Sequence, residues 1–190
     1  MLFHWLIAAF IAVNLLLVWA VDSMPKTAER PMVNLHKSIG LTVLGLAIMR
    51  LLWRWANPPP ALPRGYGQWE RLGAHWAHVA LYVLIFALPI TGWIHDSAWK
   101  NAAANPLTLY GFVPWFRIGL IANQDAATKE QIHSVFFTMH GLLAYALYGL
   151  FVLHVSGALK HQWINRQPAL QRMLPGGPLP SDPGDHPIQG

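Results

Sequence analysis

Four long runs of apolar residues dominate the chain, at about 2–21, 36–55, 73–94 and 135–159. Each run is long enough to cross a hydrocarbon core about 30 Å thick, which takes roughly 20 helical residues. Between the runs lie a short polar link, a proline-rich link at about 58–63, and a long link from about 96 to 132. The pattern predicts an all-α protein, a four-helix transmembrane bundle over 1–176, followed by a disordered Gly- and Pro-rich tail at 177–190.

Proline and tryptophan residues mark the predicted helix ends. Pro31 suits the first turn of the second helix, where a backbone N–H would have no helical partner. Trp5 and Trp19 bracket the first run, and Trp53 and Trp55 close the second, as interfacial anchors do. No Lys or Arg precedes the first run, which is also too long for the core of a signal peptide. We therefore expect a retained spanning helix there rather than a cleaved leader.

The composition narrows the class of protein. Apolar residues make up 54% of the chain and charged residues 11%, against about 25% charged in a typical soluble domain. So few charges cannot build a water-facing surface, which excludes a soluble enzyme and predicts membrane lipid as the surroundings. The net charge of +5 is scattered along the chain, so nucleic acid is not an expected partner. The absence of cysteine excludes disulfides, thiolate metal sites and cysteine nucleophiles, and ten histidines remain as the main source of chemistry.

A histidine stripe runs along the fourth predicted helix. His133, His140, His154 and His161 follow one another at intervals of 7, 14 and 7 residues, and seven residues are close to two helical turns. His140 and His154 each lie five residues inside the apolar run and about 21 Å apart along the helix axis. The stripe therefore contains two buried imidazoles at mirror-related depths.

Partners for both imidazoles exist at matching depths on neighbouring helices. We call the end of the bundle that carries residue 1 the inner end and the opposite end the outer end. His4 enters at the inner end and can meet His154, whereas His36 enters at the outer end and can meet His140. Two opposed imidazoles inside a bundle suit a flat macrocycle whose metal takes one nitrogen on each face. The pattern thus predicts two haem sites, one toward each end.

Other interpretations stay open at this point. Imidazole also binds zinc and nickel, so a non-haem metal transporter or sensor could use the same stripe, although such pathways normally include carboxylates. His75 and His78, near the start of the third helix, could replace His4 as a ligand or lie around haem propionates or a quinone. His95 and His133 border the outer link and suit interfacial positions.

Basic and histidine residues near the inner end are further candidates for cofactor contacts. Arg50 and Arg54 close the second helix, where their guanidinium groups would meet anionic groups, either lipid phosphates or the propionates of the inner haem. His161 continues the histidine stripe beyond the apolar run. The Lys and Arg counts of the two sides, seven against six, leave the orientation in the membrane open.

Several short motifs together resemble the bacterial cytochrome b561 family, integral-membrane di-haem b-type cytochromes related more distantly to the cytochrome b subunits of hydrogenases and formate dehydrogenases. The matching stretches are His4-Trp5-Leu6, His36-Lys37-Ser38-Ile39-Gly40 with Arg50 to Arg54, the Pro58–Pro60 link, His75-Trp76-Ala77-His78 with Leu88-Pro89-Ile90-Thr91-Gly92, and His140-Gly141 through His154 to His161. Together they cover about 2–176. The resemblance implies two b haems with His4, His36, His140 and His154 as axial ligands, and both termini in the cytoplasm.

The resemblance also implies a function in the inner membrane. Family members carry electrons between a quinone pool and a redox partner on the outer, periplasmic side, and one known activity is oxidation of superoxide with reduction of ubiquinone. Other members are cytochrome b subunits that anchor a separate dehydrogenase or periplasmic redox protein. The charges of the outer region 95–133 sum to zero, which gives little steering of an anion. We therefore expect haem-mediated electron transfer, with a superoxide:ubiquinone oxidoreductase as one specific form of it.

Overall fold

The computed structural model describes residues 1–21, 23–57, 67–164 and 170–173. Its long helices are α1 (Leu2–Val21), α2 (Lys26–Ala56), α3 (Gln68–Ser97) and α5 (Ala126–Leu159), which continues into a π-helical turn, Lys160–Ile164. Each of these helices is long and apolar enough to cross a membrane. The prediction of an all-α, four-helix transmembrane protein is therefore confirmed. The proline-rich link and the tail at 177–190, for which disorder was predicted, lie outside the described residues.

Short elements fill the outer link and the region after α5. Strands β1 (Thr108–Leu109) and β2 (Val113–Pro114) pair antiparallel, and the one-turn helix α4 (Gly119–Ala122) follows them. The turn between the strands uses left-handed backbone at Tyr110, with φ of 54°, and at Gly111, with φ of 84°. A 3-10 turn (Gln171–Met173) is tied back to α1 by Trp5, whose indole N–H donates to the Met173 carbonyl over 2.7 Å.

Three of the long helices, α2, α3 and α5, begin before their apolar runs. α2 begins at Lys26, so Pro31 lies inside the helix, and its predicted place in the first turn is wrong. The missing N–H of Pro31 leaves only the carbonyl of Thr27 without its helical partner, and Thr27 is exposed, where water can replace that partner. α5 begins at Ala126 because Asp125 caps it, accepting hydrogen bonds from the N–H groups of Ala127 and Thr128 over 3.0 and 3.1 Å.

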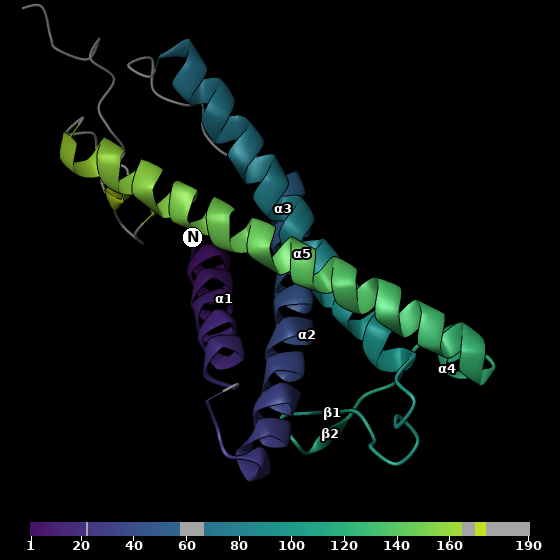
Figure 1. Ribbon diagram of the computed structural model, residues 1–190. Coiled ribbons are helices and arrows are strands. Elements are labelled where there is room, and N and C mark those ends of the chain that lie inside the picture. The colour runs from purple at the N-terminus through teal and green to yellow at the C-terminus, as the bar shows by residue number, and fades with distance from the viewer. Residues whose placement is uncertain (22, 58–66, 165–169, 174–190) are drawn as a thin grey trace, which may run out of the picture.

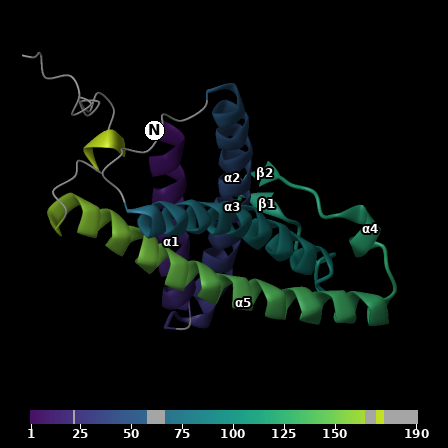
Figure 2. The same cartoon turned by 90° about the horizontal axis from the view of Figure 1, so that it is seen from above.

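The four long helices pack as two pairs. α1 lies along α2, α3 lies along α5, and α2 joins the pairs through its contacts with α3. Figures 1 and 2 show α5 crossing α1 and α2 at a wide angle and running alongside α3. The hydrophobic core lies where α1, α2 and α3 meet, and its buried residues are Ile7, Ile39, Val43, Ala47 and Ile85.

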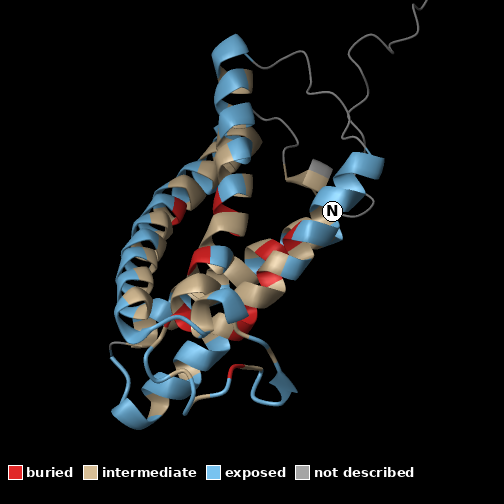
Figure 3. Ribbon diagram, turned by 90° about the vertical axis from the view of Figure 1, so that its right-hand side faces the viewer, coloured by how far each residue is buried: buried red, intermediate tan, exposed pale blue. Residues whose placement is uncertain are grey.

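The outward faces of the helices are apolar and exposed. Figure 3 shows the buried residues mainly where the helices meet, with exposed residues along the outer faces. Leu16, Leu142 and Val152 are examples, with more than half of their surface exposed. In a membrane, lipid tails cover such side chains. The histidine stripe of α5 faces inward. His140 lies across from His36 on α2, and His154 lies across from His4 on α1, which brings the candidate ligands together.

Candidate functional site

The outer pair of histidines joins α2 to α5. The ring centres of His36 and His140 lie 6.1 Å apart, with the ring planes at 87°. The Nδ1 of His140 lies 3.0 Å from the carbonyl oxygen of Leu88 on α3. A carbonyl only accepts, so Nδ1 carries the proton and Nε2 is the basic nitrogen that can bind a metal. The hydrogen bond therefore fixes both the tautomer and the direction of this ring.

The local sequence of α3 makes room for the His140 ring. Pro89 has no N–H for the carbonyl of Ile85, which loosens the helical ladder at this point. Thr91 places its hydroxyl 3.2 Å from the Nδ1 of His140. A Cβ on Gly92 would lie 3.2 Å from the Cε1 of His140, so only glycine lets the ring approach the α3 backbone this closely.

The inner pair joins α1 to α5, and a third ring adjoins it. The ring centres of His4 and His154 lie 6.4 Å apart, with the planes at 68°. His78 on α3 lies 5.3 Å from His154, with the planes at 67°. The structure thus brings together His4, His78 and His154, three of the four histidines that the sequence offered for the inner site, whereas the ring of His75 packs against Trp76.

The distances within these pairs can be compared with those that a metal requires. A metal–imidazole bond is about 2 Å long and the ring centre lies about 1 Å behind the nitrogen, so two imidazoles on opposite sides of one metal have ring centres about 6 Å apart. The outer pair, at 6.1 Å, and the pair of His4 with His154, at 6.4 Å, match this spacing, and so does His95 with His140, at 5.9 Å. His78 with His154, at 5.3 Å, is closer than it allows.

Two further observations concern what these histidine pairs can bind. The Nδ1 of His36 is buried and has no hydrogen-bond partner among the described residues. Within the same part of the chain, no group of three or more His, Cys, Asp or Glu residues converges to hold a metal ion. Imidazole pairs on which no third such ligand converges, among the described residues, suit a metal whose other positions are filled by a macrocycle.

The arginines near the inner pair both lie over one aromatic ring. The guanidinium carbons of Arg50 and Arg54 are 5.2 and 5.6 Å from the ring centre of Tyr82 on α3. Arg50 also lies close enough to His4 and His154 for its positive charge to disfavour a positive charge on either ring. The predicted contact of these arginines with an anionic group stays a prediction.

The inner end of the α5 stripe lies beyond α5 itself. His161 falls in the π-helical turn Lys160–Ile164. The preceding Lys160 forms an ion pair of 2.9 Å with Glu70 and so joins the inner ends of α5 and α3.

His95 lies closer to the outer pair of histidines than its sequence position indicated. Its ring centre lies 5.2 Å from that of His133 and 5.9 Å from that of His140, and the Nδ1 of His133 is 2.9 Å from the His95 carbonyl. α3 therefore contributes a third histidine beside each pair, His95 at the outer one and His78 at the inner one. The sequence favoured interfacial positions for His95 and His133, because both lie near predicted helix ends. No pattern in the sequence predicted the contact of His95 with His140.

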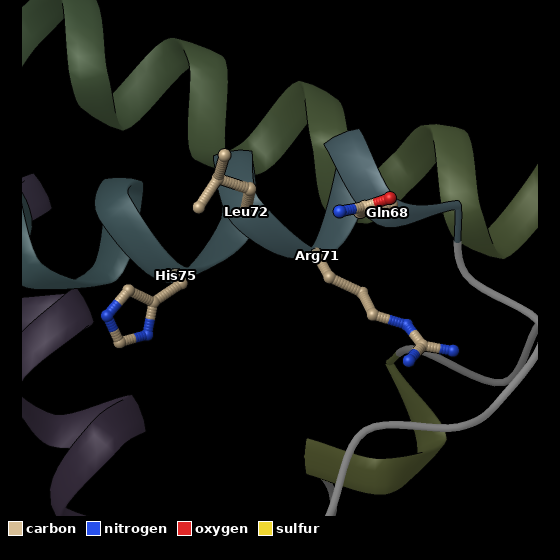
Figure 4. A pocket seen from close by; sticks show the side chains of 4 residues that line it. All are labelled: Gln68, Arg71, Leu72 and His75. Carbon is tan, nitrogen blue, oxygen red and sulfur yellow. The ribbon is translucent and has the colours of Figure 1, made fainter.

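A cavity with both polar and apolar lining residues lies beside the inner end of α3. It has a volume of about 630 Å³ and is lined by Gln68, Arg71, Leu72 and His75. Figure 4 shows the side chains of Arg71 and His75 extending to the same side of α3. His75 is one turn of helix before His78, so the cavity adjoins the inner histidines.

Comparison with known proteins finds a family and several relatives that match most of the chain. The family model described as prokaryotic cytochrome b561 matches residues 1–176. "Cytochrome b561 homolog 2" of Escherichia coli K12 is 33% identical over 174 residues, which cover 90% of this chain and 87% of the relative. "Probable superoxide oxidase CybB" of Yersinia pestis is 27% identical over 173 residues, covering 90% and 91%. "Cytochrome b561 homolog 1" of Escherichia coli K12 is 23% identical over 174 residues, covering 90% and 92%.

Proposed function

This chain belongs to the prokaryotic cytochrome b561 family, a family of membrane electron-transfer proteins, and we propose that it carries electrons across the inner membrane by means of two b haems. His36 with His140 would hold the outer haem, and His4 with His154 the inner one. The spacing of the two ring pairs, 6.1 and 6.4 Å, is the observation that carries this proposal. When bound between two imidazoles, each haem would supply reversible one-electron reduction rather than bond chemistry at the metal.

The protein's own residues orient the ligands and separate the two sites. The Leu88 carbonyl accepts the Nδ1–H of His140, and such hydrogen bonds raise the basicity of the ligating nitrogen. The two α5 ligands are 14 residues apart, about 21 Å along the axis.

The inner cavity suits a quinone headgroup. Gln68, Arg71 and His75 offer N–H donors for the two carbonyl oxygens of a quinone, and Leu72 offers an apolar wall. With both termini in the cytoplasm, as the resemblance implies, ubiquinone would be reduced at the inner end and a periplasmic redox partner would donate electrons at the outer end.

Two kinds of electron donor at the outer end come into question, and the name of one relative supports the first. The Yersinia pestis relative is named a probable superoxide oxidase, which supports superoxide as the donor and superoxide:ubiquinone oxidoreductase as the activity. The alternative is a cytochrome b subunit that accepts electrons from a separate dehydrogenase or periplasmic protein. Family membership argues against the non-haem metal transporter or sensor that the histidine stripe alone left open.

Quinone reduction by the purified, chemically reduced protein tests the inner-cavity assignment. We expect His75→Leu and Gln68→Leu to slow reoxidation by a short-chain ubiquinone at least several-fold while the haem content stays constant. Gln131→Leu, the same change at an exposed position of α5, is the matched control. Unchanged reoxidation in both cavity variants would place quinone elsewhere. Turnover with superoxide separates the two donors, because only a superoxide oxidase should accelerate superoxide-dependent ubiquinone reduction above the rate without protein and do so in the absence of another redox protein.

A further inference from the structure

Asp96 is a buried carboxylate held between two cations at the outer end of the bundle. Its side chain is 4% exposed. One oxygen lies 2.7 Å from the Nζ of Lys37 on α2, and the other lies 3.0 Å from the Nε of Arg117, which precedes α4. The two cations and one anion leave one net positive charge at this point.

The same cluster ties the outer link to the helices. Arg117 also donates to the carbonyl oxygens of Ala102 and Asn105 over 2.9 and 2.8 Å. Ser97, which is fully buried, accepts the N–H of Ile118 over 3.0 Å. Figure 1 shows this link leaving α3 and passing by the ends of α2 and α5. Asp96 is therefore the common point of α2, α3 and the outer link.

The cluster lies directly beside the outer histidines along both helices. Lys37 follows His36, and Asp96 follows His95. Adjacent residues on a helix point about 100° apart, so α2 can present His36 to α5 and Lys37 to α3 at the same time. An ion pair that holds Lys37 against α3 consequently fixes the rotation of α2, and with it the direction in which the His36 ring faces His140.

We propose that Asp96 is a positioning residue for the outer haem: its bridge to Lys37 sets the orientation of the His36 ring relative to His140. This inference rests on the proposed function, because it concerns the haem held by that pair. The arrangement is costly to keep without such a role, since a buried ion pair is often no more stabilising than apolar residues of the same volume. The bridge acts on one haem only, because the inner histidines lie about two-thirds of a membrane thickness away along α5.

Electron paramagnetic resonance of the oxidised, purified protein tests the proposal. The largest g-value of a ferric haem with two imidazoles depends on the angle between the ring planes, so it reports the orientation of His36. We expect Lys37→Met to shift the low-spin signal of the outer haem and to leave that of the inner haem unchanged. Lys37→Met keeps the pair of Asp96 with Arg117, so the fold keeps its link to α3.

A second variant and a matched control complete the experiment. Asp96→Asn should shift the same signal further or remove the outer haem, and Asp96→Glu should restore part of the change. Glu70→Gln removes the carboxylate of the ion pair with Lys160 at the inner end of α3 and should leave the outer signal unchanged. Unchanged spectra in both Lys37→Met and Asp96→Asn, or equal shifts in both haem signals, would overturn the proposal. A wild-type protein without two haem signals would instead refute the proposed function.

Discussion

At the scale of single residues, Gly92 gives a sharp test because it touches a candidate ligand directly. Alanine in place of glycine normally stabilises a helix interior by about 1 kcal/mol. At Gly92, however, the new Cβ would lie 3.2 Å from the Cε1 of His140, so the ring has to move. We expect Gly92→Ala to lower the haem content and the thermal midpoint. Gly141→Ala, with nothing within 4 Å of the added Cβ, should leave the haem content unchanged and raise the midpoint or leave it constant.

The inner ligand can be decided by comparing two histidine variants. The 6.4 Å spacing of His4 and His154 suits two ligands of one metal, whereas His78 is only 5.3 Å from His154. We therefore expect His4→Ala to lose about half of the haem per protein, as measured by pyridine haemochrome, and His78→Ala to keep most of it. The reverse result would make α3 the ligand helix. Equal losses in both variants would leave His78 as a support of the inner haem beside His4.

The sequence could predict which histidines meet but not how they are held. His36 with His140 and His4 with His154 followed from depth in the apolar runs, because helix geometry converts sequence position into depth. The acceptor for His140 is a backbone carbonyl of α3, that of Leu88. Such a contact depends on the packing and rotation of a second helix, which no spacing within the sequence specifies.

At the scale of helices, Asp125 gives α5 a cap whose strength depends on pH. Hydrogen bonds from the Thr128 hydroxyl and from the N–H groups of Thr128 and Ala127 lower the pKa of the Asp125 carboxyl from its ordinary value of 3.8. A carboxyl with a lowered pKa stabilises the folded state fully above its unfolded pKa, and this contribution is lost as the pH falls through the folded pKa. The cap is therefore complete at neutral pH and fails in acid, below about pH 4.

Hydrogen exchange in the first turn of α5 measures this effect. We expect the amides of Ala127 and Thr128 to lose protection below about pH 4, relative to the intrinsic exchange rates. Asp125→Asn keeps an effective cap that does not titrate, so its protection should not change over the same range. Asp125→Ala should expose both amides at every pH. An identical pH profile for wild type and Asp125→Asn would contradict the assignment.

Helix ends show where sequence patterns stop being informative. Apolar runs predicted four helices because lipid demands apolar side chains over the span, but nothing in that demand marks where a helix ends in water. α2 therefore starts at Lys26, so that Pro31 lies inside the helix rather than in its first turn, and α5 starts at Ala126, before its apolar run begins at 135. Asp125 matches the sequence signal for a helix start. That signal can be assigned to α5, however, only when the helix is known to extend beyond its apolar run.

At the scale of the whole molecule, the arrangement is two helix pairs with histidines facing one another across them. The rings of α5 face α1 near the inner end and α2 near the outer end, so one long helix contributes to both sites. The outer cluster of Asp96, Lys37 and Arg117 was not predicted, because Asp96 and Arg117 are 21 residues apart in the link region. Their pairing depends on the path of the outer link.

The orientation of the bundle can be tested with single cysteines, because the natural chain has none. Lys100 lies in the outer link and Asn57 at the inner end of α2, and both are exposed. If both termini are cytoplasmic, Lys100→Cys should react with a membrane-impermeant maleimide in right-side-out vesicles and Asn57→Cys only in inside-out vesicles. The opposite labelling pattern would reverse the orientation, and with it the assignment of quinone to the cytoplasmic side.

The central claim is that each chain holds two haems between two pairs of histidines. The most direct measurement is a reduced-minus-oxidised spectrum during a redox titration of the purified protein, with the haem-to-protein ratio determined on the same sample. The account predicts the sharp bands of b haem, two haems per chain, and two components in the titration, one absent in His140→Ala and the other in His154→Ala. A protein without haem bands, or one in which His140→Ala keeps both components, would contradict it.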